Sequence, residues 1–93
     1  MFSYSYTGSM QSTVTIINKL GLHARPAMQF VDVANQFKSG IKVWKGDQCV
    51  DGKSIMQMMM LAAVAGTQLS IVAEGDDAGA ALERIVLERF GEE

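Results

Sequence analysis

The chain has 93 residues, of which 48% are hydrophobic and 19% charged, a composition typical of one small globular domain. A net charge of −2 and a sequence pI near 5.3 provide no positive field for a phosphate backbone, which argues against nucleic acid as a partner. The longest apolar run, residues 55–65, is interrupted by Gln57 and falls short of the roughly 20 residues that a membrane-spanning helix needs, so membrane insertion is not expected.

Cysteine content and the N-terminal segment predict a cytoplasmic protein. One cysteine cannot form an intramolecular disulfide, and together with a single histidine it makes no zinc-type ligand set. Residues 1–11 contain no basic stretch followed by an apolar one, as a secretory signal would. They are polar and aperiodic, and we expect them to be a tail or a remnant of recombinant expression outside the fold. Residues 12–93 then form a single domain.

Hydrophobic periodicity predicts the first half of the fold. Residues 12–18 alternate in the period-two manner of a half-buried strand. Residues 19–22 are expected to form a loop. Apolar residues then recur at spacings of three and four across residues 24–37, as on one face of a helix. Residues 41–45 and 48–50 are predicted to be strands joined by a tight Gly-Asp turn, which makes a hairpin.

Capping residues predict the second half. Ser54 begins a shorter helix with Gln57 three residues on, the spacing of a capping box, and Gly66 is a plausible terminal glycine. Residues 68–73 read as a fourth strand, and the carboxylates of Asp76 and Asp77 suit the start of a last helix. The order β-α-β-β-α-β-α predicts an α/β two-layer sandwich, with one four-stranded sheet and the helices on one face.

The single histidine, His23, lies where the loop meets the first helix, with Pro26 in the first turn. A helix start presents unpaired N–H groups and a positive dipole end, which favour an anion, and Arg25 adds donors suited to phosphate oxygens. Neutral imidazole is also a good nucleophile whose N–P bond stays reactive. The alternative is that His23 is a polar cap and Arg25 a solvated side chain; spacing alone leaves both open.

A resemblance favours the reactive role. The string NKLGLHARPA at residues 18–27 closely resembles the active-site signature of HPr, the histidine-containing phosphocarrier family of the bacterial phosphoenolpyruvate-dependent phosphotransferase system. A second block, GKSIM at residues 52–56, resembles the regulatory-site region of that family, and the likeness runs from about residue 12 to residue 90. It implies an open-faced β-sandwich with a four-stranded antiparallel sheet and three helices on one face.

The same resemblance implies the chemistry of the site. Nδ1 of His23 would accept a phosphoryl group from enzyme I, which is charged by phosphoenolpyruvate, and would pass it to an enzyme IIA-type acceptor. Arg25 would contact the phosphate and Ala24 would offer its backbone N–H. No cofactor or metal is implied on the carrier, and magnesium is needed by the donor enzyme only.

The residues after Ser54 are apolar nearly all round, although a helix on a small sandwich buries only one side. Ile55, Met56 and Met59 share a face, and thioether side chains adapt to differently shaped partners. The matching family positions contact partners, so we expect these three residues to form a docking surface. The others are expected in the core: Met58, Met60 and Leu61.

Ser54 has a sufficient structural role as a helix N-cap. In some members of the resembled family the corresponding serine is phosphorylated by a dedicated HPr kinase/phosphorylase, which would place about two negative charges beside the docking surface. Gln57 stands where a small residue is more usual, a departure that bears on recognition by the kinase and by partners.

The leading interpretation is therefore a monomeric phosphocarrier for sugar uptake and not a free-standing turnover enzyme. The alternative is a regulatory interaction module, in a nitrogen-type branch or in carbon-catabolite regulation, controlled by phosphorylation at His23 or Ser54. An RNA-recognition module would need aromatic strands and a basic surface, and a hydrolase would need a second acid, base or metal cluster; the sequence favours neither.

Overall fold

The strands and helices follow one another along the chain in the predicted order, β-α-β-β-α-β-α, and one short additional strand precedes them near the N-terminus. The computed structural model describes residues 3–4, 9–16, 21–22, 24–61 and 63–88. Its elements are β1 (Ser3–Tyr4), β2 (Ser9–Thr15), α1 (Ala24–Ala34), β3 (Gly40–Lys45), β4 (Gln48–Asp51), α2 (Ile55–Met60), β5 (Gln68–Glu74) and α3 (Ala78–Glu88).

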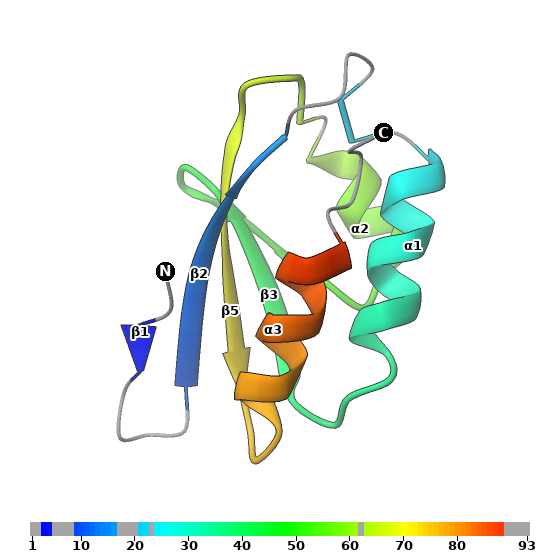
Figure 1. The fold of residues 1–93 in the computed structure, drawn as a ribbon. Helices are drawn as coiled ribbons and strands as arrows, with labels where there is room; N and C mark the ends of the chain where they lie inside the picture. Colours follow the sequence, from blue (N-terminus) through cyan, green and yellow to red (C-terminus); the bar gives the residue numbers. More distant parts are fainter. Residues whose placement is uncertain (1–2, 5–8, 17–20, 23, 62, 89–93) are drawn as a thin grey trace.

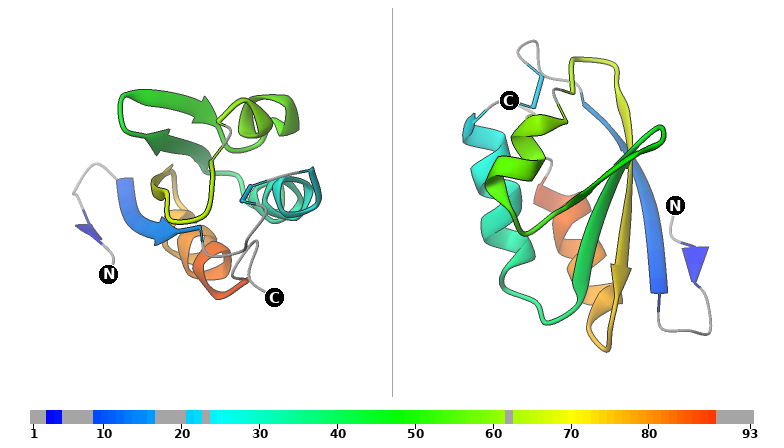
Figure 2. Two further views of the ribbon diagram at one scale, coloured as in Figure 1. Left: turned by 90° about the horizontal axis from the view of Figure 1, so that it is seen from above. Right: turned by 180° about the vertical axis from the view of Figure 1, so that it is seen from behind.

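The strands form one antiparallel sheet in the order β1-β2-β5-β3-β4 (Figure 1). The three helices pack on one face of this sheet, and no described helix covers the other face (Figure 2). Strands β2, β5, β3 and β4 with the three helices confirm the predicted two-layer sandwich. Helices α1 and α2 lie side by side and run in opposite directions, so the start of α1 lies near the end of α2. The Leu22 N–H before α1 bonds the Ala63 carbonyl after α2, and Asn35 after α1 contacts Lys53 before α2.

Alternation along the strands separates a core face from an open face. Ile41 and Val43 of β3 are buried, as are Leu69 and Ile71 of β5. Trp44 points to the opposite side of β3 and is exposed. Since side chains alternate along a strand, one sheet face builds the core under the helices and the other carries polar residues and Trp44.

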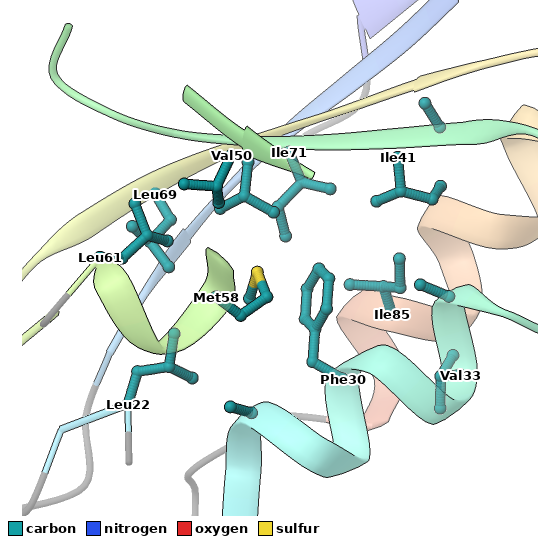
Figure 3. Close-up of a cluster of buried hydrophobic side chains, with 14 of the residues drawn as sticks. Leu22, Phe30, Val33, Ile41, Val50, Met58, Leu61, Leu69, Ile71 and Ile85 are labelled. Carbon is teal, nitrogen blue, oxygen red and sulfur yellow. The ribbon is translucent and has the colours of Figure 1, made fainter. Parts of the chain in front are cut away.

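The core joins all three helices to the sheet (Figure 3). Phe30 of α1, Met58 of α2 and Ile85 of α3 point toward Ile41 and Ile71 of the sheet, and each of the five is at most 3% exposed. Complete burial of side chains this large stabilises the fold by about 1.5–3 kcal/mol each. This packing holds the starts of α1 and α2 in a fixed relation to each other.

The N-terminal part of the fold differs from the prediction. Strand β2 begins at Ser9, three residues before the expected boundary, and ends at Thr15. Met10 pairs with Ala73 of β5 and packs partly buried against the core, while β1 pairs with the same stretch of β2. An antiparallel ladder uses backbone hydrogen bonds, which a polar and aperiodic segment can supply as well as an apolar one. Part of the segment 1–11 is therefore inside the fold.

Helix α1 ends earlier than its apolar pattern predicts, at Ala34 instead of Phe37. The N–H groups of Gln36 and Phe37 bond the carbonyls three residues back, at 3.0 and 3.3 Å, so the chain tightens into a turn. Phe37 still packs against the core, which explains why the periodicity continues past the end of the helix.

Helix α2 is also shorter than expected, because it ends at Met60 and not near Gly66. Gly66 has φ +92° and its N–H donates to the Ile16 carbonyl at 2.7 Å, while the Ile16 N–H donates to Thr67 at 2.9 Å. The glycine therefore serves the turn into β5 and does not cap the helix.

Asp77 fastens the start of α3 to the loop between α1 and β3. Its carboxylate accepts hydrogen bonds from the Ser39 hydroxyl, the Ser39 N–H at 2.9 Å and the Lys38 N–H at 2.8 Å. The sequence predicted that this carboxylate would lie at the start of its own helix, but it did not predict these hydrogen-bond partners, which lie almost forty positions away in the chain. The Ser39 hydroxyl, followed by the Lys38 N–H, lowers the pKa of Asp77 from its ordinary value of 3.8.

We expect Asp77→Asn to lower stability near neutral pH and to lose that effect in acid. A folded-state pKa below the unfolded one stabilises the protein above the unfolded value, near 3.9, and the stabilisation disappears as pH falls through the folded value. Urea midpoints of the two proteins should therefore converge below about pH 4. Asp76→Asn is the matched control. If the loss of stability caused by Asp77→Asn stays constant from neutral to acid pH, this assignment is contradicted.

Candidate functional site

His23 lies outside the described residues, so the site is built from its neighbours on both sides. Gly21 and Leu22 precede it, and α1 begins directly after it at Ala24. Ala24 and Arg25 are exposed, whereas Pro26 is buried against the core. The first turn of α1 thus presents its two outermost residues to solvent and anchors itself through the third.

The start of α1 is suited to an anion. The first N–H groups of an α-helix have no partner within the helix, and its dipole makes this end positive. The first turn contains no acidic residue, and it carries Arg25, which is exposed. An anion at this end would therefore meet backbone donors and a guanidinium without a neighbouring carboxylate of the same turn.

Gly21 and Leu22 tie the loop before His23 to the segment that follows α2. The Leu22 N–H donates to the Ala63 carbonyl at 2.7 Å, and the Leu22 side chain is buried. Gly21 has φ +72°, and a Cβ at this position would lie 2.4 Å from the same Ala63 oxygen. The sequence analysis missed Ala63, because an alanine carbonyl leaves no signal in a sequence pattern.

Ser54 caps α2 as predicted, but the capping box does not form. The Ser54 hydroxyl accepts the Gln57 N–H at 3.3 Å from an extended backbone conformation. The Gln57 side chain does not return to the Ser54 N–H, because its Oε1 accepts the Asp51 N–H at 2.9 Å. The Ser54 N–H donates to the Asp51 carbonyl at 3.1 Å. Gln57 thus ties α2 to the end of β4.

The structure separates the apolar residues of α2 into two sides. Met56 and Met59 are exposed, as expected for a surface position, and Ile55 is partly buried against the core. Met58 is fully buried, in agreement with its expected place in the core, and so is Leu61. The prediction was wrong for Met60, because its side chain is largely exposed. The six-residue helix lies on the surface and turns Met56, Met59 and Met60 outward together.

Lys53 connects the chain after the end of α1 to the start of α2, a role that the sequence analysis missed. Its ammonium donates to the Phe37 carbonyl after α1 at 2.7 Å. The Asn35 side chain contacts the Lys53 carbonyl from the other direction at 3.5 Å. In the sequence, the only indication of a role for Lys53 is its position next to Ser54. The residues around Lys53 do not indicate that its ammonium would bind a carbonyl near residue 37.

Two kinds of site have no support in the described part of the chain. Its histidine, cysteine, aspartate and glutamate side chains form no group of three that could hold a metal ion. None of its helices is both long enough and apolar enough to cross a membrane.

Comparison with known proteins places this site in a family. The family profile described as the PTS HPr component phosphorylation site matches residues 10–87. The phosphocarrier protein HPr of Pseudomonas aeruginosa is 51% identical over 83 residues, which cover 85% of this chain and 92% of that protein. The HPr-like protein Crh of Bacillus subtilis is 42% identical over 76 residues, covering 82% and 89% of the two chains.

A solved structure agrees with this assignment. The crystal structure of HPr-C-His from Thermoanaerobacter tengcongensis has a TM-score of 0.82 to this fold at 44% identity, covering 89% of this chain and 97% of the other. The matched region includes the loop before α1, the exposed first turn of α1 and the surface helix α2. The chain therefore belongs to the HPr family of phosphocarrier proteins of the phosphotransferase system.

Proposed function

We propose that Nδ1 of His23 accepts a phosphoryl group from enzyme I of the phosphotransferase system and passes it to an enzyme IIA-type protein. The neutral imidazole attacks phosphorus in line with the leaving atom of the donor, so the N–P bond forms as the donor bond breaks. Transfer to the acceptor repeats this step with His23 as the leaving group. The chain is then a carrier that is regenerated in each cycle.

The observation that carries the proposal is the first turn of α1, directly after His23. Arg25 and Ala24 are exposed there, and the turn contains no acidic residue. We assign the Arg25 guanidinium and the Ala24 N–H to the phosphoryl oxygens, since both donate to an anion at a helix start. Family membership supports this assignment, because the matched profile is that of a phosphorylation site.

We assign docking on both partners to the outer side of α2, where Met56 and Met59 are exposed and Ile55 is partly buried. Flexible thioether side chains adapt to surfaces of different shape, as a carrier with two partners requires. The hydrogen bond between Leu22 and Ala63 supports the placement of this surface near the histidine loop, because it joins that loop to the segment after α2.

Intact mass measurement tests the proposal. The protein is incubated with phosphoenolpyruvate, magnesium and enzyme I from the same bacterium. We expect one added phosphoryl group, lost on brief treatment with acid because an N–P bond is acid-labile. Addition of an enzyme IIA protein should then remove the group. No added mass, with enzyme I shown to be active on another carrier, would contradict the proposed function.

A second role, regulation through Ser54, is favoured by one observation. Ser54 is only partly buried at the start of α2, two residues before the exposed Met56. A phosphate there would add about two negative charges beside an apolar docking surface and weaken docking. Incubation with an HPr kinase/phosphorylase and ATP should add an acid-stable phosphoryl group to the protein but not to Ser54→Ala. Addition to both proteins would exclude Ser54 as the target.

We also propose that the chain serves sugar uptake as a cytoplasmic monomer. A carrier that visits two proteins in turn needs its docking surface free of other copies. Sedimentation of the phosphorylated and unphosphorylated forms measures the oligomeric state directly.

A further inference from the structure

The chain contains seven methionines. Four of them have exposed side chains, whereas Met58 is fully buried. The exposed fractions are 76% for Met56, 67% for Met60, 52% for Met28 and 46% for Met59, whereas Met58 is 0% exposed. We call Met28, Met56, Met59 and Met60 the exposed methionine group. Apolar side chains of this size are usually buried, so their concentration on the surface requires a reason.

The exposed methionine group lies along one side of the helical layer. Met56, Met59 and Met60 follow spacings of three and four, which places them on one face of α2. Met28 and Asn35 are seven residues apart, about two helical turns, and the Asn35 N–H still bonds the Val31 carbonyl just past the end of α1, so both lie on the same side of this helix. The Asn35 side chain contacts the Lys53 carbonyl just before α2. Met28 therefore stands on the side of α1 that faces α2.

We propose that the exposed methionine group is a site of reversible oxidation by hydrogen peroxide, which switches off partner docking. The thioether sulfur attacks one peroxide oxygen, the O–O bond breaks, and the products are a methionine sulfoxide and water. Sulfur loses two electrons and the peroxide gains them. Methionine sulfoxide reductases reverse the reaction with a dithiol, so the change is a switch and not permanent damage.

The effect on docking follows from the change in polarity. A sulfoxide is a polar, chiral group, and several of them on one surface would have to be desolvated against an apolar partner. This step rests on the proposed function, because it acts on docking of enzyme I and enzyme IIA-type proteins. Oxidation of the exposed methionine group leaves the core intact, since the Met58 side chain packs between α2 and the sheet and is closed off from solvent (Figure 3).

The site is tested by mass mapping, which does not depend on activity. The protein, in a Cys49→Ser background because Cys49 is an exposed free thiol, is treated with hydrogen peroxide under native conditions. Fragmentation of the tryptic peptide 54–84 separates the four methionines of this segment. We expect one oxygen at Met56, Met59 and Met60 and none at Met58. Oxidation of Met58 to the same extent as its neighbours would overturn the assignment.

The consequence is tested by the initial rate of phosphoryl transfer from enzyme I. We expect the oxidised protein to react at least about tenfold more slowly at limiting concentration, and full recovery after a sulfoxide reductase with dithiothreitol. A variant with leucine at positions 28, 56, 59 and 60 has no exposed thioether in this group, so it is compared with its own untreated rate, which peroxide should leave unchanged. Oxidised protein that transfers at the untreated rate would overturn the switch. An untreated protein that accepts no phosphoryl group would instead reject the proposed function and leave the oxidation map standing.

Discussion

A protein in which His23 is replaced by alanine is expected to accept no phosphoryl group from enzyme I. His23 is the only histidine of the chain, and the expected acid-labile N–P bond requires an imidazole. Loss should therefore be complete and not partial. Intact mass after incubation with phosphoenolpyruvate, magnesium and enzyme I measures it, and amide hydrogen exchange of β5 and α3 verifies that the variant is folded.

Arg25→Ala provides a graded comparison. Loss of one charge-assisted donor to the phosphoryl oxygens should slow transfer by about a hundredfold and still allow the reaction to reach one group per chain. Arg25→Lys keeps the charge but not the planar fork of donors, so its transfer rate should lie between those of Arg25→Ala and the unchanged protein.

An acid-labile phosphoryl group on the His23→Ala protein would contradict the first prediction, because it would show that another residue is the acceptor.

Gly21→Ala is expected to destabilise the fold by about 3 kcal/mol, which combines the cost of a left-handed backbone with that of a backbone clash. Gly21 has φ +72°, and its new Cβ would lie 2.4 Å from the Ala63 oxygen and 3.0 Å from Cα of Val64. Relief of this contact moves the loop and breaks the hydrogen bond between Leu22 and Ala63. We therefore also expect slower phosphoryl transfer.

Gly46→Ala is the matched control, because it measures the cost of the left-handed backbone conformation without a clash. Gly46 has φ +59°, and nothing lies within 4 Å of a Cβ built there. Its replacement should cost only the left-handed conformation, about 1–2 kcal/mol, with an unchanged transfer rate. Urea denaturation of both variants measures the difference. Equal destabilisation by the two substitutions would mean that the Ala63 contact has no energetic role.

The candidate site divides into residues that the sequence predicts and residues that it does not. Arg25 and the start of α1 were predicted, because a helix start and its charge are specified by adjacent residues. Lys53 and Ala63 were not, because their hydrogen bonds join segments far apart in the chain. The role of His23 came from its signature, and its position lies outside the described residues.

The fold divides in the same way. Periodicity, turn residues and capping residues together predicted the four main strands and three helices, since each of these signals lies among neighbouring residues. Element ends were less predictable. Phe37 continues the apolar pattern of α1 although it follows the helix. Strand β2 extends into the polar segment before Ser12 through backbone pairing with β5, and only Met10 of that stretch packs against the core.

The sequence by itself determined the order of the elements, the helix start after His23 and the surplus of apolar side chains on α2, because each of these depends on residues close together in the chain. Only the tertiary structure decided that Met60 faces solvent while Met58 fills the core, and that the Asp77 carboxylate binds Ser39. An all-apolar helix has no preferred side until the sheet and its neighbours cover one, and a carboxylate finds its donors only after distant segments have packed together.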